Sequence, residues 1–279
     1  MKKSTEKKKK GGFSLISEER LLKLYEAITC FEMLERASAG KKLKQENDAA
    51  LAAGVLLHLH GHERVLLSMQ KRGHRLLKGE QLSSVLHDAR HAARAGILAL
   101  NEHSSASEQL HLASGVALAL KNRRKNPATV IFIEGNQTAG KEWESALQFA
   151  VQQKLGLVVL CKGAPRISAR NKKNALGYDE PGSRSAVKGL PPVLLVDGSD
   201  SIAVYRVAQE ALTHAREGSR PTVIRALGAN EIGEINALED QEPLIRMENY
   251  LKSKGLFTAK LKNQVRKEFT ARLKSARKG

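Results

Sequence analysis

A strand–turn–helix–strand pattern in residues 129–166 constrains the fold of this chain more than any other feature. It begins with a short apolar, β-branched run, Thr129-Val-Ile-Phe-Ile133, which is typical of a strand inside a parallel sheet. The turn Glu134-Gly135-Asn136 ends that run. A helical pattern follows over residues 141–154, and Leu155-Gly-Leu-Val-Val-Leu160 predicts the second strand. Both strands of such a unit end at the carboxyl edge of the sheet, where open α/β folds bind their ligands.

The remaining pattern predicts an α/β fold, a doubly wound and mostly parallel sheet with helical flanks at both ends. Before the central unit we predict helices at residues 17–34, 48–60, 80–100 and 110–121 and a strand at 63–69. After it we predict strands at 193–196 and 221–225 and helices at 201–216, 243–252 and 258–278. Because strands and helices alternate, residues 17–279 are expected to form a single domain.

The composition indicates a globular protein of the cytoplasm. The chain has 279 residues, of which 41% are hydrophobic, and this is enough for a substantial core. No apolar run approaches the roughly 18–20 residues that cross a membrane. Two cysteines, Cys30 and Cys161, make no disulfide framework, and the basic start is not followed by the apolar segment of a signal peptide.

The formal charge of +18 is concentrated at the two ends of the chain. Residues 1–16 are predicted to be a disordered basic arm, with six lysines and only Glu6 as an acid. Residues 259–279 carry eight basic side chains against Glu268 alone. Such runs bind the phosphates of nucleic acids, but they also form solvated faces or docking surfaces for acidic partners. Nucleic-acid binding is therefore retained as an alternative function.

The histidines and Cys161 invite chemical interpretations that the sequence supports weakly. His58, His60 and His62 lie close together, and His87 and His91 are four residues apart on a predicted helix. No His-Glu-x-x-His motif, cysteine pair or evident carboxylate ligand accompanies them, so a zinc site is the weaker hypothesis. Cys161 ends an apolar strand without an identifiable catalytic partner, which favours a buried structural thiol over a nucleophile.

Three segments carry a resemblance to a known family. They are Gln109–Lys121 (QLHLASGVALALK), Thr129–Cys161 and Pro192–Ala226, and the last is similar to the block VDGND…A…A…AR.G.GPT.IEA. From about Tyr25 to Arg277 the chain resembles the alpha subunit of thiamine-diphosphate-dependent 2-oxo acid dehydrogenases. These subunits belong to the decarboxylating component of pyruvate, branched-chain and acetoin dehydrogenase complexes. The resemblance implies a fold of the thiamine-diphosphate-binding type.

The resemblance also implies a cofactor, thiamine diphosphate with Mg, held between an alpha and a beta subunit. The family holds the metal and the diphosphate with a Gly-Asp-Gly turn and a later Asn-Asn pair, and it adds a Tyr-Arg pair and a loop histidine. Here the Gly-Asp-Gly turn falls on Ile133-Glu134-Gly135, so Glu134 takes the metal position. The Asn-Asn pair falls on Gly163-Ala164, and the Tyr-Arg pair falls on Met69-Gln70. The loop of the histidine is shortened to residues 228–234, which contain none.

The family's cofactor-facing positions are carried over to seven residues, with Ser104 as an alternative to the serine. They are Gln70, Ser105, Glu134, Gly135, Asn136, Lys162 and Ala164. The turn at 134–136 has a second interpretation, an ordinary strand-to-helix connection in which Asn136 or Thr138 caps the helix. Lys162 likewise is either a phosphate contact or a solvated loop lysine.

Two functional hypotheses follow from the resemblance. In the first, the chain forms a heterotetramer with a beta subunit, decarboxylates a 2-oxo acid and delivers the acyl group to a lipoyl acyltransferase core, with the beta subunit supplying the glutamate that activates the cofactor. In the second, the chain is a pseudoenzyme, an alpha-like subunit that serves assembly or regulation. Metal ligands, an arginine and a histidine are lost at one site together, and this favours the second hypothesis. A second shortened loop, between Gly79 and Ser104, leaves the substrate undefined.

Overall fold

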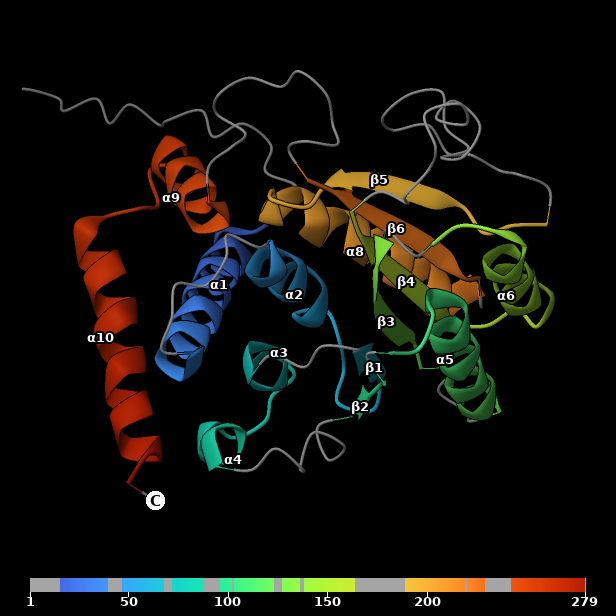
Figure 1. Ribbon diagram of the computed structural model, residues 1–279. Coiled ribbons are helices and arrows are strands. Elements are labelled where there is room, and N and C mark those ends of the chain that lie inside the picture. The colour runs from blue at the N-terminus through green and yellow to red at the C-terminus, as the bar shows by residue number, and fades with distance from the viewer. Residues whose placement is uncertain are drawn as a thin grey trace, which may run out of the picture.

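Six parallel strands form the central sheet of the protein (Figure 1). The computed structural model describes residues 16–39, 47–67, 72–87, 96–101, 103–122, 127–135, 138–163, 189–218, 220–228 and 242–278. The strands are β1 (Arg64–Leu67), β2 (Ile97–Ala99), β3 (Thr129–Glu134), β4 (Leu157–Lys162), β5 (Val193–Asp197) and β6 (Thr222–Leu227). Their order is β2-β1-β3-β4-β6-β5, and every neighbouring pair is parallel. The predicted α/β fold with a doubly wound parallel sheet is confirmed.

Strands β3 and β4 and the helix between them reproduce the central unit that the sequence predicts. Helix α6 (Lys141–Gln152) presents Trp143, Ala146, Leu147 and Ala150 to the sheet and leaves its other face in solvent. Strand β4 is buried on both faces, as expected for a strand in the middle of a parallel sheet. In the register of the two strands Thr129 lies opposite Leu157 and Glu134 lies opposite Lys162. The carboxyl ends of β3 and β4 are therefore side by side.

Helices cover both faces of the sheet. On one face, α5 (Ala106–Lys121) and α6 pack against alternate residues of β3 and β4, namely Ile131, Ile133, Leu157, Val159 and Cys161. On the other face, α2 (Asp48–Leu56) and α8 (Ser201–Gly218) pack against the intervening residues Val130, Val158 and Leu160. Alternate buried side chains of β3 and β4 thus meet helices on opposite faces of the sheet, in agreement with the two-residue alternation of a strand.

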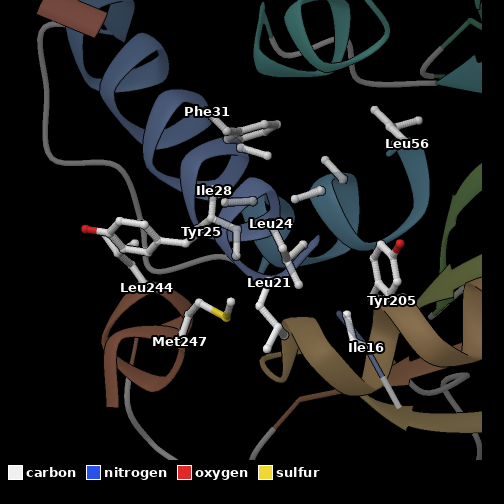
Figure 2. Packing of buried hydrophobic residues seen from close by; sticks show 14 of the residues in the cluster. Ile16, Leu21, Leu24, Tyr25, Ile28, Phe31, Leu56, Tyr205, Leu244 and Met247 are labelled. Carbon is white, nitrogen blue, oxygen red and sulfur yellow. The ribbon is translucent and has the colours of Figure 1, made fainter. Parts of the chain in front are cut away.

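A second core joins the amino-terminal and carboxyl-terminal helices (Figure 2). Helix α1 (Glu18–Ala39) buries Leu21, Leu24 and Ile28 against α2 and α9 (Pro243–Ser253). The side chain of Met247 comes from α9 into this cluster, as Figure 2 shows. Ile16, the last residue of the predicted basic arm, is buried there too, whereas residues 1–15 lie outside the described ranges.

Helix α10 (Ala259–Ala276) lies at the periphery of the molecule, away from the sheet (Figure 1). It buries Phe269 and Leu273 in a small core with Cys30 and Leu34 of α1 and with α4 (Leu82–His87). No helix in the described ranges is both long enough and apolar enough to span a lipid bilayer.

The predicted helix over residues 80–100 is wrong. The segment contains the short helix α4 and, after residues 88–95, which lie outside the described ranges, the edge strand β2. A short apolar run such as Gly96-Ile-Leu-Ala-Leu cannot be distinguished from a helical segment by periodicity alone. Gly96 has φ +78°, a backbone conformation that does not continue a helix. Ile97 and Leu98 instead pair with Val65 and Leu66 of β1.

Helix α3 (Arg72–Leu77) is an element that the sequence does not predict. Its Gly73 lies so close to α1 that a Cβ atom there would stand 2.2 Å from the ring of Phe31. The Gly73 amide donates a hydrogen bond of 2.7 Å to Glu35. A glycine in a six-residue helix weakens the local helical signal. The formation of α3 therefore depends on its tertiary contacts with α1.

A buried carboxylate connects three elements at the amino edge of the sheet. Glu63 is 1% exposed, and its two oxygens accept hydrogen bonds from the Arg216 guanidinium of α8 at 2.8 and 2.7 Å. The backbone amides of Ala128, which precedes β3, and of His60 also donate hydrogen bonds to this carboxylate, at 3.1 and 2.8 Å. Burial alone would raise the pKa of Glu63, but the bonds from Arg216 and the backbone hold that pKa below its ordinary value.

Candidate functional site

The candidate site lies at the carboxyl edge of the sheet, where β3 and β4 end in glycine turns. Glu134 is exposed at the last position of β3, and Lys162 is its neighbour on β4. A Cβ atom on Gly135 would lie 1.9 Å from the carbonyl oxygen of Gly163. The Gly163 amide in turn donates a bond of 2.7 Å to the carbonyl oxygen of Ala226 on β6. The backbones of the two turns are therefore in direct contact, and only glycine fits at position 135.

Lys162 forms an ion pair at this edge. Its Nζ lies 2.8 Å from Oδ1 of Asp48, the first residue of α2. The two side chains are 29% and 13% exposed, so the pair is partly withdrawn from water. The interpretation of Lys162 as a solvated loop lysine is therefore wrong. Lys162 lies opposite Glu134 in the β3–β4 register, and its ammonium group contacts α2 on the face of the sheet that this helix covers.

A buried arginine lies under the β3–α6 turn. Arg225 of β6 is 6% exposed and lies beside Cys161 in the β4–β6 register. Its Nη1 donates a bond of 3.1 Å to the Thr138 hydroxyl, which itself donates a bond of 2.6 Å to the carbonyl oxygen of Gly135. Arg225 Nε has no acceptor among the described residues. The candidate site therefore contains a second fixed positive charge.

Sequence reasoning missed Arg225, although a signal for it exists. In the segment PTVIRA the arginine interrupts a buried strand, at the position where the similar family block has a glutamate. Charged side chains are rarely buried in a strand without a specific partner. The arginine in this apolar run is therefore a sequence signal for a specific polar contact inside the sheet.

A second polar cluster, also missed, follows strand β5. Arg246 of α9 contacts Asp197 Oδ2 at 2.6 Å and lies 3.7 Å from Asp200, and it also donates to the Ser199 hydroxyl. Asp197 Oδ1 accepts bonds from the amide and hydroxyl of Ser199 at 2.9 and 2.7 Å. Burial opposes ionisation, but these bonds hold the pKa of Asp197 below its usual range. The cluster fixes the β5 turn to α9.

Ser105 has a structural partner that explains its position. It is the N-cap of α5: its hydroxyl accepts a bond of 3.2 Å from the Glu108 amide, and Glu108 accepts a bond of 2.7 Å from the Ser105 amide. This reciprocal pair is a capping box. Of the other predicted site residues, Gln70, Asn136 and Ala164 lie outside the described ranges. The structure thus brings Glu134, Gly135 and Lys162 together at one edge.

The turn after β3 does not use the predicted helix cap. The N-cap of α6 is Gly140, with φ +100° and no side-chain hydrogen bond, while Thr138 binds the carbonyl oxygen of Gly135. The amino end of α6 therefore keeps backbone amides without a capping side chain.

The histidines have separate structural environments. His58 Nε2 lies 2.8 Å from the carbonyl oxygen of Tyr205, and burial lowers the pKa of His58 to about 4. The rings of His60 and His62 are stacked with centroids 5.7 Å apart, and His87 Nε2 bonds the carbonyl oxygen of Ala276. In the parts of the chain that the structure describes, no group of three histidine, cysteine or acidic side chains has the geometry of a metal site.

Both cysteines are expected to be unreactive in the native protein. Burial raises the pKa of Cys161 to about 11 and that of Cys30 to about 12, so the nucleophilic thiolate is scarce near neutral pH. In native buffer at pH 8, a thiol reagent such as DTNB should label neither residue within minutes, and in urea it should label both. Rapid labelling of one thiol in the native protein would show that its burial is incomplete.

The six-stranded parallel sheet, covered by helices on both faces, is consistent with an α/β fold of the thiamine-diphosphate-binding type. A model of the family "Dehydrogenase E1 component" matches residues 44–279, and the chain belongs to this family.

Individual relatives agree with the family match. The chain is 25% identical over 196 residues to the pyruvate dehydrogenase E1 component subunit alpha of Staphylococcus aureus strain Mu50, covering 65% of this chain and 53% of the relative. It is 25% identical over 193 residues to the corresponding subunit of Acholeplasma laidlawii, covering 64% and 56%. The chain is also 25% identical over 233 residues to the alpha subunit of the acetoin:2,6-dichlorophenolindophenol oxidoreductase of Bacillus subtilis strain 168. This match covers 73% of this chain and 69% of the relative. The matches to the first two relatives span little more than half of their length.

Proposed function

We propose that this chain is a non-catalytic alpha-like subunit of the E1 family, which assembles with a beta-like chain and does not hold thiamine diphosphate through Mg. The observation that carries the proposal is the lack of a side-chain oxygen at Gly163, which occupies one of the two asparagine positions in the turn after β4. In the family this edge is the place of the diphosphate and its metal.

The donor set supports this proposal, because Mg²⁺ requires near-octahedral oxygen coordination at short distances. Glu134 offers a carboxylate, but Gly163, at one of the two asparagine positions, offers no side-chain oxygen. The described residues thus do not fit a magnesium–diphosphate group.

The proposal leaves the assembly role of the fold intact. Alpha subunits of this family pair with beta subunits, and the sheet, both helical layers and the α1–α9 core are present in this chain. A heterotetramer with a beta-like chain follows as the proposed assembly. Delivery of an acyl group to a lipoyl acyltransferase core belongs only to the competing hypothesis of a catalytic subunit.

Calorimetric titration of thiamine diphosphate with MgCl₂ tests the cofactor part of the proposal. We expect no magnesium-dependent heat with the chain alone or with a co-purified beta-like chain, and no difference between the wild type and Glu134→Ala. The alpha and beta subunits of the Staphylococcus aureus pyruvate dehydrogenase relative provide the positive control. Micromolar binding that requires Mg²⁺ and is abolished by Glu134→Ala would make the chain a catalytic subunit.

Co-expression tests the assembly part independently. A beta-like chain should co-purify with this chain in a stable complex of defined mass, whether or not the cofactor is present. A beta-like chain that binds a family alpha subunit but leaves this chain monomeric would contradict the assembly proposal.

A further inference from the structure

A row of lysines lies on the outward face of α10. Lys260, Lys267 and Lys274, called here the lysine row, are exposed and follow one another at seven-residue intervals. Seven residues are close to two helical turns, so the three side chains share one face and are about 10 Å apart along the axis. The opposite face of the helix is fixed by the buried residues Phe269 and Leu273.

The lysine row has no ionic partner within the described part of the chain. The acid of α10, Glu268, lies beside the row and accepts a bond of 2.9 Å from Gln264. Helix α1 shows the usual alternative, because there Lys23 pairs with Glu19 at 2.6 Å and Arg36 pairs with Glu32 at 3.2 Å. Solvated helical faces commonly alternate basic and acidic side chains in this way. The lysine row contains basic side chains only.

Helix stability does not explain the lysine row. Lys260 is the second residue of α10, whose first turn contains no acid. A cation at that end is disfavoured by the partial positive charge of the helix amino terminus. Lys274, near the carboxyl end, would stabilise the helix, but Lys260 and Lys267 would not. Stabilisation of the helix therefore does not account for Lys260 and Lys267.

The chemistry of the row favours a phosphate polymer over an acidic protein. Protein–protein interfaces have an apolar centre and are depleted in lysine, and none of the exposed large hydrophobic residues of the described chain lies on α10. Phosphates require cations and no apolar contact. Aromatic residues make up 4% of the chain, so platforms for stacking single-stranded bases are few. These properties match the backbone of a duplex.

We propose that the lysine row of α10 binds the phosphate backbone of double-stranded nucleic acid without sequence preference. The net charge of +18 would steer the duplex toward the protein, and the rigid row would place three ammonium groups against phosphates. This site lies apart from the carboxyl edge of the sheet and does not depend on the proposed loss of the cofactor.

Fluorescence anisotropy with a labelled random-sequence DNA duplex tests the proposal on the full chain. The dissociation constant is measured between about 50 and 200 mM salt, where each phosphate contact contributes about 0.9 to the slope of log K against log salt. The row variant, Lys260→Ala with Lys267→Ala and Lys274→Ala, should lower that slope by about 2.7, and Lys267→Ala alone should lower it by about 0.9.

The matched control removes the same charge elsewhere. Lys141→Ala, Arg206→Ala and Arg220→Ala change three exposed cations on other elements, and this variant should retain the wild-type slope. Circular dichroism should show native helicity for both triple variants. The proposal fails if the wild type does not bind the duplex at low salt or if the two triple variants lose affinity equally. It also fails if the row variant loses binding to polyglutamate and keeps binding to the duplex.

Discussion

Gly135→Ala is expected to destabilise the protein by about 3 kcal/mol, because the added methyl group has no space. The Cβ atom would lie 1.9 Å from the Gly163 carbonyl oxygen and 2.7 Å from that of Lys162. Both obstacles are backbone atoms that belong to the end of β4 and its turn. Accommodation therefore requires the β3 and β4 turns to separate, which strains the hydrogen bond from Gly163 to Ala226.

Urea denaturation monitored by circular dichroism should show this effect as a lower unfolding midpoint. The dependence of the unfolding free energy on urea concentration should be unchanged. Gly115→Ala is the matched control, because a Cβ atom at this exposed position of α5 would meet nothing within 4 Å. Alanine is favoured over glycine inside a helix by about 1 kcal/mol, so the control should be stabilised. A wild-type midpoint for Gly135→Ala would show that the two turns are not in contact.

Glu63→Gln is expected to cost about 3 kcal/mol at neutral pH, since it removes one partner of a buried ion pair. The carboxylate is 1% exposed and satisfies the Arg216 guanidinium and two backbone amides. A glutamine would direct amide hydrogens at groups that are themselves donors. Glu19→Gln, in an exposed pair with Lys23, is the control and should leave the urea midpoint unchanged.

The same substitution should alter the dependence of stability on pH. The folded-state pKa of Glu63 lies below the ordinary value of 4.5, so its contribution is present above that value. The contribution is lost as the pH falls through 4.5 toward the folded-state pKa. The wild type should therefore lose more stability on acidification than Glu63→Gln, and parallel curves for the two proteins would contradict the role of Glu63.

The central part of the fold could be predicted because its sequence signals are local. Apolar β-branched runs mark β3 and β4, and the amphipathic period marks α6, so these elements appear within a few residues of their predicted bounds. Strand β2 and helix α3 depend instead on contacts with β1 and α1, distant in sequence. Short elements of that kind carry no periodic signal.

The candidate site was predictable to the level of the sheet edge. The resemblance and the βαβ pattern together locate Glu134, Gly135 and Lys162 at one place. They do not reveal that Lys162 pairs with Asp48, which lies in an earlier helix, or that Arg225 reaches Thr138. These contacts between distant segments follow from the packing of α2 on the sheet and from the position of β6 next to β4, which no local pattern encodes.

The cluster of Asp197 and Arg246 bears on the smallest part of the chain that folds by itself. Arg246 belongs to α9, which also buries Leu244, Met247 and Leu251 beside α1. A fragment that ended before residue 242 would leave Asp197 without its counter-ion and would expose an apolar face of α1. Helix α9 lies outside the sheet, but it is part of the unit that folds cooperatively. A fragment that ends with strand β6 is therefore expected to aggregate.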